Sequence, residues 1–212
     1  MWVENNEFKG FYVEVESAIL ERMGQKYVFV EYTNSEKVVM DIKDGSIHCG
    51  VASPIIPDFQ QLANFADSYT TLDLITLVQQ DTDNIGGITP EEVIKSLFGK
   101  TVGVQARGIE YNLLREYREI NIVEYETGTV ALEKLAIGEV DAKIENKEIA
   151  LYHARMNGWD IKPVGVPLHS MVLAMSFSKR VDPEIITRYN AALKEIQNDS
   201  TYDRIYNSWF GE

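Results

Sequence analysis

The sequence has little cysteine and little histidine: one cysteine and three histidines in 212 residues. The single thiol, Cys49, excludes an internal disulfide and a metal site built from several cysteines. His48, His153 and His169 show no spacing typical of a zinc motif. Cys49 lies in an apolar run, so we interpret it as a buried structural thiol rather than a nucleophile. We expect no metal and no cofactor.

Positive charge and long apolar runs are also scarce. Twenty Lys and Arg stand against 33 Asp and Glu, which gives a net charge of -13. Nucleic-acid binding needs clustered basic residues, so we expect no such partner and interpret the acidic surface as solvated. No run approaches the roughly 18 apolar residues that span a bilayer. Residues 1–5 show neither the basic nor the apolar region of a signal peptide.

Catalytic and phosphate-binding motifs are missing as well. The sequence contains no phosphate loop, dinucleotide fingerprint, catalytic triad or metal cluster, and Gly86-Gly87 indicates only a loop. The common sequence signatures of catalysis and of phosphate binding are therefore missing.

What the sequence does contain is an alternation of helical and strand periodicities. In the first part, helices are predicted over 15–23 and 35–43, and strands over 27–32 and 47–52. Such βα units build sheets that helices cover.

A polar break at 79–87 separates this part from a second set of elements. Thr89, Pro90 and Glu92 predict the start of a helix with a capping box. Strands are predicted over 102–105, 120–125, 140–144 and 172–177, and helices over 109–118, 129–137, the segment ending at 157–158, 183–197 and 202–209. The fold class is therefore α/β, with two doubly wound lobes.

Five segments, spread over the whole chain in order, resemble one known family. They are Glu7-Phe-Lys-Gly-Phe-Tyr-Val-Glu-Val15, Phe65-Ala-Asp-Ser-Tyr69, Leu97-Phe-Gly-Lys-Thr-Val-Gly-Val-Gln105, Leu135-Ala-Ile-Gly-Glu-Val-Asp-Ala142 and Asp199-Ser-Thr-Tyr-Asp-Arg-Ile-Tyr-Asn-Ser-Trp-Phe-Gly211. With these motifs the sequence resembles the family 3 extracellular solute-binding proteins of bacteria, whose best-known members bind polar amino acids for ABC importers.

The resemblance implies a fold of the periplasmic binding protein type II. Lobe 1 would comprise 1–70 plus 173–212 and lobe 2 would comprise 71–172. The chain would cross between them near 69–72 and 169–173 as a two-strand hinge, with ligand in the interlobe cleft. It further implies a periplasmic monomer that serves an ABC-transporter permease or a membrane sensor. The family's first strand is absent before Trp2, so the sheet of lobe 1 would lose a member.

In lobe 1, the position that would hold a ligand carboxylate departs from the family pattern. Members carry an Arg in a "T-P-E-R" segment, and its guanidinium forms a bidentate pair with the carboxylate. Phe59 or Gln60 stands there, and no Arg occurs anywhere from 23 to 106. Phe59 is interpreted either as a stacking floor or as a core residue.

Lobe 2 departs at its matching positions too. Arg107-Gly108 replaces the family's "G-T" turn, and Asn146, beside Glu145, replaces the Asp that receives a ligand ammonium. Arg107 could contact a carboxylate or face solvent, and Glu145 could receive an amine or be a solvated acid. The expected ligand-binding residues are Trp2, Ser53, Phe59, Gln60, Tyr69, Gln105, Arg107, Gly108, Glu145 and Asn146.

These departures disfavour a standard α-amino acid as ligand, because a buried charge without its partner costs several kcal/mol. The leading hypothesis is a solute-binding protein or ligand-sensing domain with another small polar ligand. Two alternatives stay open. One is a dehydratase-like enzyme with Glu145 as general acid. The other is a degenerate module that binds a protein partner.

Overall fold

The computed structural model describes residues 2–4, 7–32, 34–106 and 108–211. The chain divides into two compact units: unit 1 consists of 1–71 and 171–212, and unit 2 consists of 72–170. The helices are α1 (Phe11–Arg22), α2 (Ser35–Asp44), α3 (Pro57–Gln60), α4 (Pro90–Ser96), α5 (Ile109–Leu114), α6 (Gly128–Ala136), α7 (Lys147–Asn157), α8 (Pro183–Asn198) and α9 (Thr201–Phe210). The strands are β1 (Trp2–Glu4), β2 (Glu7–Lys9), β3 (Cys49–Pro54), β4 (Ala63–Phe65), β5 (Thr70–Gln79), β6 (Thr101–Gln105), β7 (Asn121–Tyr125), β8 (Ala142–Asn146) and β9 (Ile161–Ser178).

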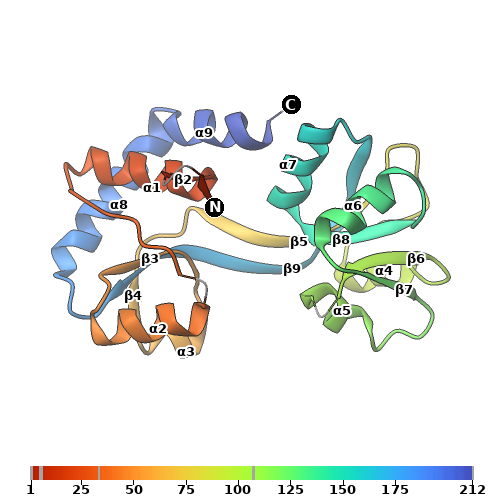
Figure 1. The fold of residues 1–212 in the computed structure, drawn as a ribbon, viewed down its shortest axis with the longest axis horizontal. Coiled ribbons are helices and arrows are strands. Elements are labelled where there is room, and N and C mark those ends of the chain that lie inside the picture. The colour runs from red at the N-terminus through yellow and green to blue at the C-terminus, as the bar shows by residue number, and fades with distance from the viewer. Residues whose placement is uncertain (1, 5–6, 33, 107, 212) are drawn as a thin grey trace. The chain divides into compact units, whose positions relative to one another are not determined.

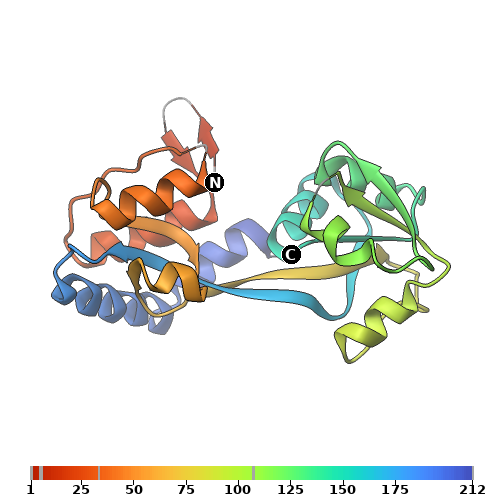
Figure 2. The same cartoon turned by 90° about the horizontal axis from the view of Figure 1, so that it is seen from below.

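The strands form a mixed sheet rather than a purely parallel one. Its order is β3-β9-β5-β8-β6-β7, with β4 also paired to β9. The strand β6 is parallel to β7 and β8, whereas β3 and β4 are antiparallel to β9, and β5 is antiparallel to β8. Both β5 and β9 contribute residues to both units, and they run side by side in Figures 1 and 2.

In unit 1, helices cover both faces of the strands (Figure 1). On one face, α1, α8 and α9 pack against Met175 and Phe177 of β9 in a cluster that includes Ile19 and Tyr189. On the other face, α2 and α3 enclose a smaller cluster around Ile42. Alternate residues of a strand point to opposite faces, and this alternation separates the two clusters. The strands β1 and β2 pair as an antiparallel hairpin beside this unit (Figure 2).

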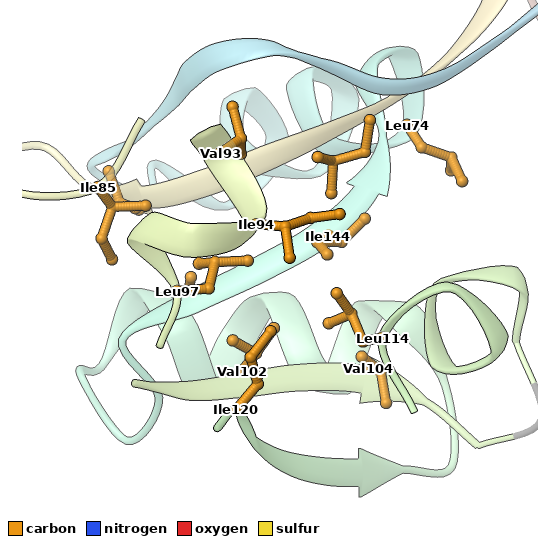
Figure 3. Close-up of a cluster of buried hydrophobic side chains, with 13 residues drawn as sticks. Leu74, Ile85, Val93, Ile94, Leu97, Val102, Val104, Leu114, Ile120 and Ile144 are labelled. Carbon is orange, nitrogen blue, oxygen red and sulfur yellow. The ribbon is translucent and has the colours of Figure 1, made fainter. Parts of the chain in front are cut away.

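Unit 2 has the same layered design. The helices α4 and α5 bury Val93, Leu97 and Leu114 against β6 and β8 (Figure 3). The helices α6 and α7 cover the opposite face through Leu132 and Ala150. The capping box at α4 forms with a one-residue shift. Thr89 accepts from the N–H of Glu92, as predicted, but the Glu92 carboxylate accepts from the N–H of Ile88.

The expected α/β class is confirmed, but some elements differ. The predicted strand at 27–32 is wrong, because within the described residues this segment pairs with no strand. Its Val28 and Val30 are 86% and 62% exposed. A strand needs a hydrogen-bonded partner. The strand β3 lies at the end of the sheet order, and within the described residues 27–32 do not pair with its free edge. The periodicities also missed β5 and the first half of β9, and α5 ends at Leu114 rather than 118.

A membrane-spanning helix is not among the described elements: none of those helices combines the required length with sufficient apolar character.

Candidate ligand-binding site

A β-bulge shapes the carboxyl end of β3 in unit 1. The register against β9 shifts between Gly50 and Ser53, and Ala52 adopts a φ of 47°, which is uncommon for a residue with a side chain. The bulge turns the Ser53 hydroxyl inward, where it lies 3.1 Å from the carbonyl oxygen of Gly50 and 2.7 Å from the Ser176 hydroxyl oxygen. Ser53 is buried, so its polar group is satisfied within unit 1.

Phe59 and Gln60 lie in the short helix α3 with opposite exposure. Phe59 is buried in the cluster under α2, and its ring contacts that of Phe65 edge-on at 5.3 Å between centroids. This placement favours the core interpretation of Phe59 over a stacking floor. Gln60 is exposed and its side chain remains available to solvent.

Tyr69 belongs to a buried hydrogen-bond network that the sequence analysis missed. Its hydroxyl donates to Glu16 Oε1 at 2.6 Å, and the hydroxyl of Tyr189 donates to Glu16 Oε2 at 2.8 Å. The Tyr69 carbonyl accepts from the hydroxyl of Tyr202 at 2.9 Å. Burial raises the pKa of Glu16 to about 7, against the lowering effect of the two tyrosine hydrogen bonds. The network anchors the residue that immediately precedes β5.

In unit 2, Gln105 and Gly108 lie at the carboxyl end of β6. Gln105 is the last residue of β6 and is exposed, while Gly108 caps α5 and donates its N–H to the Gln105 carbonyl at 2.9 Å. The Glu110 carboxylate folds back beneath this turn and accepts from the Gln105 N–H at 3.0 Å. A Cβ at position 108 would overlap that carboxylate, so a larger residue there would displace the Glu110 side chain.

Glu145 and Asn146 end β8 beside this turn. Glu145 is not a solvated acid: its side chain is 12% exposed, and its Oε2 lies 3.4 Å from Nζ of the fully buried Lys143. Asn146 caps α7 by accepting from the Ile149 N–H at 2.9 Å. In the first turn of α7, burial raises the pKa of Glu148.

The structure brings together the unit 2 residues of the expected set and separates those of unit 1. A Cβ on Gly128 would meet both the Glu145 and the Gln105 side chains, so these two flank the start of α6. Open α/β sheets bind ligands at such carboxyl ends of strands. In unit 1, Phe59 and Tyr69 belong to clusters on opposite faces. Arg107 and the side chain of Trp2 lie outside the described residues.

Sequence reasoning missed Lys143, Glu110 and Glu16. Nothing in the sequence indicates that Lys143 is buried, because residues 140–145 alternate apolar and charged side chains, a pattern that predicts an exposed lysine. The partner two residues away, Glu145, lies on the same face of the strand.

A hollow in unit 2 does not coincide with these residues. An open polar hollow of about 540 Å³ is lined by Gln79, Asp81, Thr82, Asp83, Asn84, Ile85, Lys100, Gly138, Val140 and Asp141, and none of them belongs to the expected set. In the part of the chain that the structure describes, no group of His, Cys, Asp and Glu side chains could hold a metal ion.

The comparisons with known proteins agree with this fold. The family model of the bacterial extracellular solute-binding proteins, family 3, matches residues 1–212, and the chain belongs to this family. It is similar to the probable amino-acid-binding protein YxeM of Bacillus subtilis, with 25% identity over 99% of this chain and 78% of that protein. It is also similar to the putative amino-acid ABC transporter-binding protein PatH of Vibrio harveyi, with 32% identity over 69% of this chain and 58% of that protein.

Among solved structures, the second substrate-binding domain of Lactococcus lactis GlnP, in its open conformation, superposes with a TM-score of 0.78. That comparison covers 99% of this chain and 88% of the other at 19% identity, and it therefore supports the fold alone.

Proposed function

We propose that this chain is a periplasmic solute-binding protein, not an enzyme, that captures a small polar molecule for an ABC importer or for a membrane sensor. Its ligand is not a standard α-amino acid, and residues of both units contact it. Family membership supports solute binding, and the internal pairing of Glu145 with Lys143 carries the proposal about the ligand. An acid already paired within the chain is not free to receive a ligand ammonium.

Three of the four arginines of unit 1 support the same proposal. Arg22 is held by Asp199 at 2.7 Å, and the guanidinium of Arg188 donates to the Met23 carbonyl at 2.8 Å. Arg204 donates to the Thr201 hydroxyl at 2.9 Å. These three guanidinium groups bind their own chain, which counts against their use in the bidentate carboxylate contact that an α-amino acid requires.

A thermal-shift screen tests the proposal. The purified chain is heated with each standard L-amino acid and with polar molecules that lack an α-ammonium group, such as dicarboxylates, sugars and polyols. A ligand at about 100 times its Kd stabilises the folded state by about 2.7 kcal/mol, which raises Tm by several degrees. We expect such a shift in the second set only. Saturable calorimetric binding of an L-amino acid at micromolar Kd would contradict the proposal.

Site variants connect any binding to the carboxyl end of β6. We expect Gln105→Ala to weaken binding of the identified ligand about tenfold, equivalent to about 1.4 kcal/mol, through loss of a side-chain contact. Gln80→Ala, at an exposed position of the same unit, is the matched control and is expected to bind like the unmodified chain. Equal effects of the two substitutions would argue against this location.

A further inference from the structure

Unit 2 contains a buried lysine ammonium held by groups of its own chain. Lys143 is 0% exposed, and Nζ donates to the Ile144 carbonyl at 2.6 Å and to Glu110 Oε1 at 3.2 Å. Glu145 Oε2 lies 3.4 Å from Nζ and adds an ion pair. Two of the three donors of the ammonium are thus in hydrogen bonds, and two carboxylates balance its charge.

The two carboxylates are held in place by groups other than the lysine. The backbone N–H of Gln105 donates to Glu110 Oε1 at 3.0 Å, and that of Asn146 donates to Glu145 Oε1 at 2.9 Å. Glycine at 108 and at 128 leaves room for the Glu110 and Glu145 carboxylates, respectively, since a Cβ at either position would collide with them. Each acid therefore has a backbone hydrogen bond and free space beside it, in addition to its pairing with the ammonium.

The surroundings of Lys143 suit an aliphatic chain that ends in a cation. Its neighbours across the sheet are Leu77 of β5 and Gly103 of β6, an apolar side chain and a residue with none. The Glu110 and Glu145 side chains are 10% and 12% exposed, so two nearly buried negative charges face one positive charge. Buried carboxylates at this spacing need a counter-cation with N–H donors.

We propose that Glu110 and Glu145 form a cation-binding site for a primary ammonium group, which this chain fills with its own Lys143. The lysine is thereby a specificity-determining residue, because it occupies the position between Glu110 and Glu145 that a ligand ammonium would otherwise take. The inference rests on the proposed function, because it requires that these strand ends face the ligand. It adds that the ligand does not place a primary ammonium group between Glu110 and Glu145.

Chemical rescue of Lys143→Ala tests the site directly. Alanine retains Cβ, so n-propylammonium replaces the atoms that are removed. We expect Lys143→Ala to melt well below the unmodified chain, and we expect n-propylammonium chloride to restore several degrees of Tm with saturation in the millimolar range. Neutral 1-propanol, tetramethylammonium chloride, which has no N–H donor, and sodium chloride at equal ionic strength are expected to restore much less. The unmodified chain should not respond.

Two further variants keep the test decisive. The triple variant Lys143→Ala/Glu110→Gln/Glu145→Gln removes the negative charge of the site. In this variant, the ratio of the apparent binding constants of n-propylammonium and 1-propanol, taken from the saturation of the Tm shift, is expected to fall at least tenfold. If Lys143→Ala does not fold, Lys143→Met leaves space at the Nζ position only, and ammonium chloride should then stabilise it more than sodium chloride. Equal rescue by the propyl alcohol and the propyl cation, or no rescue of any folded variant, overturns the proposal.

Because these probes replace a side chain and not the natural ligand, the result is independent of the ligand screen. Rescue without any hit in the screen would leave the cation site standing and count against solute binding. An L-amino-acid hit together with failed rescue would refute both proposals separately.

Discussion

At the scale of single residues, the most unusual group is the buried carboxyl of Glu16. It has no exposed surface, and the hydroxyls of Tyr69 and Tyr189 both donate to it. Burial and the nearby Glu16 raise the pKa of the Cys49 thiol to about 11 and raise the pKa of both tyrosines. In the described surroundings, Glu16 is thus the group expected to titrate near neutral pH.

This arrangement predicts a pH-dependent stability that Glu16→Gln removes. The folded-state pKa of about 7 lies above the ordinary value of 4.5 for a glutamate, so the folded state binds more protons between these values. The stabilising contribution is therefore complete below about pH 4.5 and is lost as the pH rises through about 7. At 1.36 kcal/mol per pKa unit, the loss amounts to about 3 kcal/mol.

Urea unfolding of both chains from pH 5 to pH 8 measures the effect. The free energy of unfolding of Glu16→Gln should exceed that of the unmodified chain at pH 8 and approach it at pH 5. Other titrating groups, such as Glu148, are common to both chains and cancel in the difference. A difference that does not change with pH would show that Glu16 is already ionised throughout this range.

At the scale of elements, local pattern was a good guide where an element makes its own hydrogen bonds. The helices α2, α6 and α8 were predicted to within two residues of their observed ends, because their caps and apolar faces are encoded locally. Strands depend on distant partners, and residues 27–32 show the consequence. Their apolar, β-branched sequence predicted a strand, but within the described residues no strand lies beside them.

The exposure of this segment gives a prediction of its own. The double substitution Val28→Thr/Val30→Thr should change the free energy of unfolding by less than about 0.5 kcal/mol, as at other exposed positions. Val102→Thr is the control in β6, where the residue is 0% exposed and a buried hydroxyl costs about 1–3 kcal/mol. Urea unfolding measures both. A loss in the double variant as large as that of Val102→Thr would show that 27–32 is packed as a strand.

At the scale of the whole molecule, the sequence predicted the fold better than the site. Motifs from Gly10 to Gly211 predicted the α/β class because they mark turns and core positions along the full length. The site depends on side chains that meet only after folding: Glu110 and Lys143 are 33 positions apart, and Glu16 and Tyr189 are 173 apart. Periodicity places Lys143 on the polar face of its strand, and it could identify neither the burial of this lysine nor its partners.

The continuity of unit 2 leads to a prediction about folding. Residues 72–170 form one uninterrupted segment with apolar clusters on both faces of its strands, whereas unit 1 is assembled from two segments. Most contacts of a unit that has its own core are internal, so such a unit can fold alone. We expect a fragment of residues 72–170 to unfold cooperatively in urea, with an m-value of about 1–3 kcal/mol/M.

A shorter fragment, 72–160, provides the control because it lacks the part of β9 that belongs to unit 2. It loses Leu168 from the core and the hydrogen bond from the Val166 N–H to the Gly87 carbonyl at 3.2 Å. We expect circular dichroism to show no cooperative transition for this fragment.

If 72–170 also fails to unfold cooperatively, unit 2 depends on unit 1 for its stability. If it folds, Lys143→Ala within it should respond to n-propylammonium as in the full chain, because Glu110, Lys143 and Glu145 all lie in this segment.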